Sequence, residues 1–135
     1  MKKPSSEKPD ARELAARASV ASRMWKHYNN AKKKHPYFCD MITCLSRTGA
    51  DTHLDIYRST LKAEADNGCV EAYTVLMCEF YEALQAYRHD NTSHAVDECF
   101  DAIAVLLRTI DVLEGRQKLG KPGNVHTKPK KGKNK

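Results

Sequence analysis

The sequence predicts an all-α protein, and three observations support this fold class. Only six glycines and five prolines occur in 135 residues, and most of them lie near the ends of the chain. Apolar residues recur at spacings of three and four, which places them on one face of a helix. No segment shows the alternation of apolar and polar residues that is typical of a strand. We therefore expect a bundle of four to five helices over residues 10–116, with a central antiparallel helical hairpin that carries the acidic motifs described below.

The first predicted helix runs from Asp10 to Lys34. Asp10 is a suitable N-cap, three lysines at the far end complement the helix dipole, and Pro36 prevents the helix from continuing. Residues 35–49 then form a short aromatic connection and a turn. The apolar positions of this helix follow a single stripe that we expect to be buried, namely Leu14, Ala18, Ala21, Trp25 and Tyr28.

Three further helices are predicted. The second begins near Asp51 and ends at Asn67-Gly68, which is a strong C-terminal stop. The third spans about residues 70–89, and the fourth spans about residues 94–115. Because the turn at 90–93 is short and polar, we expect the third and fourth helices to form an antiparallel hairpin.

Charge is unevenly distributed along the chain. The formal net charge is +6, yet residues 10–114 carry four more acidic than basic residues. The basic excess lies in residues 1–9 and in the Lys-rich tail, residues 117–135. Neither segment has enough apolar surface to bury, so we predict that both are disordered. The tail suits non-specific contact with nucleic acid, or it serves solubility alone.

The cysteines and the apolar runs bear on localisation. Five cysteines occur, an odd number, and no two have the Cys-x-x-Cys spacing, which favours free thiols in a reducing compartment. No apolar run approaches the length of a membrane-spanning helix, and the N-terminus lacks the apolar region of a signal peptide. We therefore expect a cytoplasmic protein with no membrane partner.

Two pairs of carboxylates lie within the most hydrophobic segments. Glu79 and Glu82 belong to the third predicted helix, and Glu98 and Asp101 belong to the fourth. Residues at i and i+3 lie on nearly the same side of a helix, so each pair shares a face. Asp101 interrupts the run Cys99–Leu107, which is apolar around the whole helix and should be buried on most sides. A divalent cation, Mg²⁺ or Mn²⁺ as a substitute, would offset the cost of burying these four carboxylates.

A simpler interpretation of the acids is that they pair with basic residues elsewhere or lie on a solvated face. For Glu79 and Glu82 alone this interpretation stays open. The position of Asp101 in an apolar run, and the match between the two pairs, favour the cation site. A di-iron bundle is excluded because it requires Glu-x-x-His, and no glutamate is followed by histidine at i+3.

The two acidic motifs resemble the signature of a known family. Glu-x-x-Glu, a gap of 15 residues, and Glu-x-x-Asp followed by an aliphatic run are similar to the motifs of the all-α nucleoside triphosphate pyrophosphohydrolases. These are the MazG-like proteins, with the dimeric dUTPases among their relatives. The resemblance covers about residues 70–110, and His35–Asp40 also looks like a segment of some small members. The chain departs from the pattern at Cys78, where many members have a second Glu, and at Cys99-Phe100, where many have Leu-Gly.

The resemblance implies a Mg²⁺-dependent hydrolase. It would cleave (deoxy)nucleoside triphosphates between the α and β phosphates, giving a monophosphate and pyrophosphate. The ion, held by Glu79, Glu82, Glu98 and Asp101, would lower the pKa of a bound water. We expect Glu79 or Glu82 to accept that water's proton. The resemblance also implies a homodimer or homotetramer, and the apolar fourth helix agrees with self-association.

Cations and aromatic residues complete the expected site. Arg108 lies seven residues after Asp101, on the same helical face, and is a candidate for phosphate binding. Lys32 and Lys33 are further candidates, although cations at helix ends are often only solvated. An aromatic platform for the base is expected from Trp25, Tyr37 and Phe38. For Trp25, packing in the core is the alternative.

Two other functions remain open at this stage. One alternative to the hydrolase is a non-catalytic helical adaptor whose basic tail binds nucleic acid, and the other is a family relative that binds nucleotide and Mg²⁺ without turnover. The departures at Cys78 and Cys99 keep the second possibility open.

Overall fold

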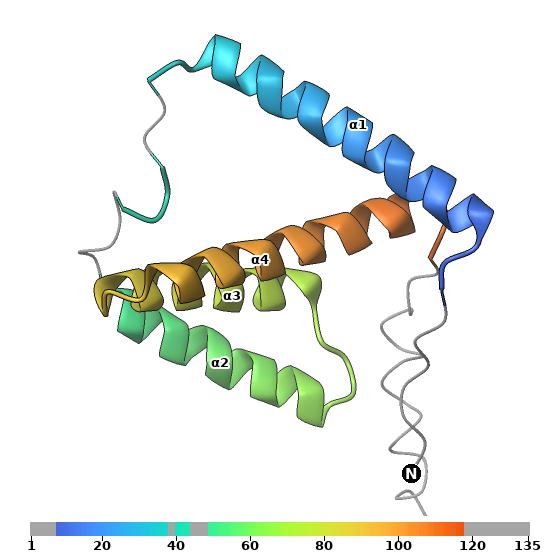
Figure 1. The fold of residues 1–135 in the computed structure, drawn as a ribbon. Coiled ribbons are helices and arrows are strands. Elements are labelled where there is room, and N and C mark those ends of the chain that lie inside the picture. Colours follow the sequence, from blue (N-terminus) through green and yellow to red (C-terminus); the bar gives the residue numbers. More distant parts are fainter. Residues whose placement is uncertain (1–7, 38–39, 44–48, 118–135) are drawn as a thin grey trace, which may run out of the picture. The chain divides into compact units, whose positions relative to one another are not determined.

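The computed structural model describes residues 8–37, 40–43 and 49–117. Within these ranges the chain forms four helices and no strand, so the predicted all-α class is confirmed (Figure 1). The chain divides into two units, residues 1–39 and residues 40–135, and each is described by itself. The disorder expected for the two ends falls almost wholly outside the described residues and stays a prediction.

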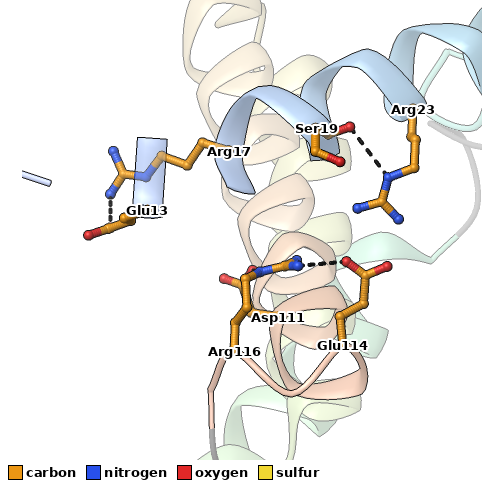
Figure 2. Close-up of polar contacts among 7 residues, drawn as sticks. All are labelled: Glu13, Arg17, Ser19, Arg23, Asp111, Glu114 and Arg116. Carbon is orange, nitrogen blue, oxygen red and sulfur yellow. Dashed lines mark hydrogen bonds and ion pairs between the residues drawn. The ribbon is translucent and has the colours of Figure 1, made fainter. Parts of the chain in front are cut away.

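Helix α1, Ala11–Lys34, is the helix of the first unit, and local signals account for its bounds. The Asp10 carboxylate accepts a hydrogen bond from the Glu13 N–H at 2.8 Å and so caps the first turn, as predicted. One turn later, Glu13 pairs with Arg17 at 2.5 Å (Figure 2). The last turn contains three lysines, and the His35 N–H closes it on Ala31 at 2.8 Å. The helix is therefore specified by contacts within about one turn of each residue.

The expectation that the apolar stripe of α1 is buried is not met within the first unit. No residue of α1 is buried, and Leu14, Trp25 and Tyr28 are each more than half exposed. The rings of Trp25 and Tyr28 meet edge to face at 5.3 Å, and the Lys32 ammonium lies 5.5 Å from the centre of the Tyr28 ring. Periodicity determines which residues share a face, but burial of that face requires a second surface.

Helix α2, Ala50–Asp66, begins the second unit and ends at the predicted stop. Gly68 has φ of 83°, in the left-handed region that favours glycine. Its N–H donates to the Ala65 carbonyl at 3.0 Å, and the Cys69 N–H donates to the Glu64 carbonyl at 3.0 Å. The chain then turns into the next helix.

Helix α3, Ala72–Arg88, packs against both α2 and α4 and is the centre of the second unit. The Glu64 carboxylate of α2 secures its start by accepting hydrogen bonds from the Glu71 N–H at 2.9 Å and the Thr74 hydroxyl at 2.8 Å. Leu54 of α2 and Leu84 of α3 are fully buried between the helices. The smaller buried apolar residues of this core are Ala50, Cys78, Ala83, Ala86 and Ala95.

Helix α4, Thr92–Leu113, follows α3 after a three-residue link, His89–Asn91. Asp90 adopts φ of 58° in this link, and the Asn91 N–H donates back to the Ala86 carbonyl at 2.9 Å. The Asn91 side chain then caps α4 by accepting from the His94 N–H at 3.2 Å. The two helices therefore run side by side in opposite directions (Figure 1).

The expectation that α4 is buried on most sides is not met within the second unit. Phe100 is 62% exposed and Leu106 is 51% exposed, and Val96 and Ile103 also face outward. Burial is confined to Ala95 and Glu98. The reason is that α4 packs against α3 alone within this unit, and one partner covers one face.

The C-terminal end of α4 is held by local charges. Arg116 contacts the carboxylates of Asp111 at 3.0 Å and Glu114 at 2.7 Å (Figure 2).

In the part of the chain that the structure describes, no helix is long and apolar enough to cross a membrane.

Candidate functional site

Three carboxylates from α3 and α4 converge on one place. Glu79, Glu98 and Asp101 each offer an oxygen, and these three oxygens lie within 4.8 Å of one another. They meet because antiparallel packing turns the acidic face of α3 toward the acidic face of α4. Glu98 is buried, Glu79 is partly buried and Asp101 is exposed. We refer to these three residues as the carboxylate cluster.

Glu79 has an unusual affinity for protons. Burial, a hydrogen bond with Glu98 and the negative charges of Glu82, Glu98 and Asp101 together raise the pKa of the Glu79 carboxyl to about 7. Each of these causes disfavours the ionised form. At neutral pH the cluster therefore holds a proton or is open to a positive ion.

Glu98 has a second contact within α4. Its carboxylate lies 3.2 Å from the Nε2 atom of His94, one turn earlier in the helix. The imidazole contributes an ionic attraction only when it is protonated. Sequence reasoning did not identify His94, although its i, i+4 spacing from Glu98 was a usable signal.

Glu82, the fourth predicted ligand, lies in a different contact. Its Oε2 atom is 2.6 Å from the Nη2 atom of Arg58, which belongs to α2. For this residue, the structure shows the ion pair that the sequence had left open as an alternative. Sequence reasoning did not identify Arg58, because 24 residues separate it from Glu82 and no local spacing links them.

Asp101 was expected to be buried, but the buried acid of this pair is Glu98. Asp101 is exposed, whereas Glu98 is 8% exposed. Three residues of helix correspond to a rotation of about 300°, so the two side chains differ by about 60° in direction. That difference is enough to bury Glu98 on the side toward α3 and to leave Asp101 at the rim of the cluster.

Cys78 stands where many MazG-like proteins have a further glutamate. Here it is a core residue, 3% exposed, in the helix that packs against both neighbours. Burial, followed by the charges of Glu82 and Glu79, raises the pKa of its thiol. The thiol is therefore neutral at physiological pH and behaves as a small apolar group.

The other predicted site residues are placed as follows. Arg108 is exposed on α4, and in the described ranges it forms no ion pair with a carboxylate of the cluster. Trp25, Lys32, Lys33 and Tyr37 belong to the first unit, where Tyr37 is 95% exposed. Phe38 lies outside the described residues.

An aromatic row that sequence reasoning missed lies between α2 and α3. The His53 and Tyr81 rings stack at 5.1 Å, and the Tyr57 and Tyr81 rings stack at 5.8 Å. Tyr73 closes the row, with its ring 6.2 Å from that of Tyr57. The i, i+4 spacing of His53 and Tyr57 indicated a shared face, but not what that face contacts. Such a row helps to hold α2 against α3.

Comparison of the chain with protein-family models, with curated proteins and with solved structures finds no match. The carboxylate cluster and the two acidic motifs that form it are therefore the features of this chain that bear on its function.

Proposed function

We propose that this protein is a Mg²⁺-dependent nucleoside triphosphate pyrophosphohydrolase of the MazG-like kind, with its site on the hairpin of α3 and α4. The observation that carries the proposal is the convergence of Glu79, Glu98 and Asp101 within 4.8 Å. The resemblance of the two acidic motifs supports the reaction, which separates a nucleoside monophosphate from pyrophosphate.

The chemistry of the cluster suits Mg²⁺. This ion prefers hard oxygen ligands, and it is commonly bound by a few carboxylates together with water and substrate phosphates. Mutual repulsion among the three acids contributes to the raised pKa of Glu79. A divalent cation would remove that repulsion and favour the ionised form of Glu79.

Roles in the reaction follow from the contacts of each carboxylate. When bound, Mg²⁺ would neutralise phosphate charge and lower the pKa of a coordinated water. Glu79 is the proposed general base, because its carboxylate belongs to the cluster, is partly buried and forms no ion pair with a basic residue in the described ranges. Glu82 is less suited, because Arg58 occupies one of its oxygens. In the proposed reaction the water oxygen bonds to the α phosphorus and gives its proton to Glu79, while the bond from the α phosphorus to the bridging oxygen breaks and pyrophosphate leaves.

Three further parts of the proposal concern substrate contacts, self-association and cellular setting. Arg108, Lys32 and Lys33 are proposed to contact phosphates, and Trp25, Tyr37 and Phe38 are proposed to contact the base. Association into a homodimer or homotetramer would cover the exposed apolar residues of α4. Free thiols at Cys69, Cys78 and Cys99 agree with a cytoplasmic setting.

A second candidate function is binding of nucleotide and Mg²⁺ without turnover. The observation that favours it is the ion pair between Arg58 and Glu82, which leaves three carboxylates in the cluster where four were expected. A weaker cation site would bind substrate but fail to activate water.

The test is a panel of ribo- and deoxyribonucleoside triphosphates incubated with the full-length protein and Mg²⁺. Products are separated by ion-exchange chromatography. We expect monophosphate and pyrophosphate from at least one nucleotide, and we expect Asp101→Asn and Glu79→Gln to lower the rate by about 100-fold or more.

Asp66→Asn is the matched control for charge. Asp66 is an exposed acid on α2 whose ion-pair partner is Lys62, one turn away, so its removal should leave the rate unchanged. Binding of nucleotide without any product would establish the second candidate. Turnover that survives Asp101→Asn and Glu79→Gln would place the site elsewhere.

A further inference from the structure

We propose that Arg58 binds the phosphates of the substrate at the edge of the carboxylate cluster, and that Glu82 positions Arg58 for this task. The inference deepens the proposed function and rests on it. It assigns Glu82, which sequence reasoning placed among the cation ligands, to the substrate side of the site.

The Arg58 side chain is only partly engaged by its ion pair with Glu82. A guanidinium has five N–H donors, and the contact with Glu82 is made from one terminal nitrogen, Nη2, at 2.6 Å. The side chain of Arg58 is 49% exposed, whereas that of Glu82 is 26% exposed. Arg58 therefore has both donors and solvent access for a phosphate, while its partner is the more enclosed member of the pair.

The ion pair of Arg58 and Glu82 lies on the face of α3 that also carries Glu79. Glu82 lies three residues after Glu79, on the same face of α3. Arg58 contacts Glu82 directly, so from α2 it reaches the face of α3 that Glu79 and Glu82 share.

A triphosphate would bring further negative charge to a site that is already acidic. Three carboxylates repel a polyphosphate, and one divalent cation offsets only part of that repulsion. Arginine is the side chain best suited to supply further positive charge, because its planar fork donates two parallel hydrogen bonds to phosphate oxygens. Two side chains form ion pairs with the acidic motifs in the described ranges, Arg58 and His94, and of these only arginine is charged at every physiological pH.

Glu82 can hold the Arg58 side chain in place before a phosphate binds. A long flexible side chain loses conformational freedom when it binds a ligand, and a contact that fixes it beforehand reduces this loss. An exposed ion pair contributes little to folding stability, so a phosphate can share the guanidinium without disrupting the fold. Glu82 thus acts on the substrate through Arg58.

The competing explanation is that Arg58 only links α2 to α3. The chain offers a matched control, since Arg88 of α3 forms the same kind of link, with its Nη1 atom 3.4 Å from the carboxylate of Asp51 on α2. Arg88 lies nine residues beyond Glu79, which is about 13 Å along the helix axis. A merely structural role would give Arg58 and Arg88 similar behaviour.

The test measures two binding equilibria on the full-length protein. Mn²⁺ alone is titrated by electron paramagnetic resonance, and inorganic tripolyphosphate is titrated by calorimetry in saturating Mg²⁺. For Arg58→Gln we expect Mn²⁺ affinity within about twofold of wild type and tripolyphosphate affinity about 10- to 100-fold weaker, as for loss of a charge-assisted hydrogen bond.

Further variants separate positioning from binding. Arg58→Lys should recover part of the tripolyphosphate affinity because it retains the charge. Glu82→Gln should weaken tripolyphosphate binding less than Arg58→Gln does and leave Mn²⁺ affinity unchanged. Arg88→Gln should change neither equilibrium. Circular dichroism checks that each variant is folded. If Arg58→Gln does not fold, the tripolyphosphate affinity of Arg58→Lys is the deciding measurement.

Several results would overturn the inference. Tighter Mn²⁺ binding by Arg58→Gln would mean that Arg58 withholds a cation ligand, and equal losses in Arg58→Gln and Arg88→Gln would mean a structural link. Wild-type protein that binds Mn²⁺ and tripolyphosphate through Arg58, but cleaves no nucleotide, would refute the proposed enzymatic function while leaving this inference intact. Wild-type protein that binds neither probe would refute both.

Discussion

Replacing Glu79 with glutamine is expected to stabilise the cation-free protein at about pH 8 and to have little effect on its stability at about pH 5. At about pH 8 wild-type Glu79 is ionised within a cluster of acids, and glutamine removes that charge while keeping the shape of the side chain. At about pH 5 the wild-type carboxyl is already protonated and resembles glutamine.

The sign and size follow from the pKa. In the folded chain the pKa of Glu79 is raised from 4.5 to about 7, so between these values the folded state binds more protons than the unfolded state. The free energy of unfolding therefore falls as pH rises through this window. The full shift corresponds to about 3 kcal/mol. Solvent access to the partly exposed carboxyl screens the effect, so we expect Glu79→Gln to gain about 1–2 kcal/mol at high pH.

The assay is urea unfolding followed by circular dichroism between about pH 5 and pH 8.5, in the presence of a chelator. The informative quantity is the difference in unfolding free energy between Glu79→Gln and wild type at each pH, because other titrating groups cancel in that difference. Glu71→Gln, which alters an exposed glutamate next to α3 and outside the cluster, is the control. A difference that stays flat with pH, or a Glu79→Gln protein less stable at pH 8, would refute the assignment of a like-charged cluster.

Three more predictions concern the cation, the core and the surface. Mg²⁺ at 100 times its dissociation constant should stabilise the wild type by about 2.7 kcal/mol in urea unfolding at matched ionic strength. It should stabilise Asp101→Asn much less, and equal effects would argue against the cluster as the binding site. Leu84→Ala should cost about 2–5 kcal/mol in the same assay because Leu84 is fully buried, whereas a loss below about 1 kcal/mol would contradict the packing of α3. If α4 drives self-association, Phe100→Asp should lower the molar mass measured by sedimentation equilibrium, since this ring is 62% exposed. An unchanged molar mass would exclude that surface.

The helices were predictable because their signals are local. Asp10 caps α1 through a contact three residues away, and Gly68 ends α2 through its own backbone conformation. Asn91 caps α4 in the same manner as Asp10. Each of these features operates within about one helical turn, so the sequence contains what is needed to infer it.

The burial of the helix faces was not predictable in the same way. The stripe of α1 and the apolar run of α4 share the spacing of buried faces, yet Trp25 and Phe100 are each exposed within their own unit. Spacing determines which residues lie on one face, and the number of packing partners determines how much of that face is covered.

The candidate site shows the same difference between what local spacing specifies and what packing specifies. Helical geometry sets the direction of residues three apart, so spacing alone puts Glu79 on one face with Glu82, and Glu98 on one face with Asp101. The packing of the helices, which spacing does not specify, buries Glu98, leaves Asp101 at the rim and pairs Arg58 with Glu82. The packing of α2, α3 and α4 brings these groups together across up to 24 residues of chain, a separation over which spacing in the sequence carries no information about contact.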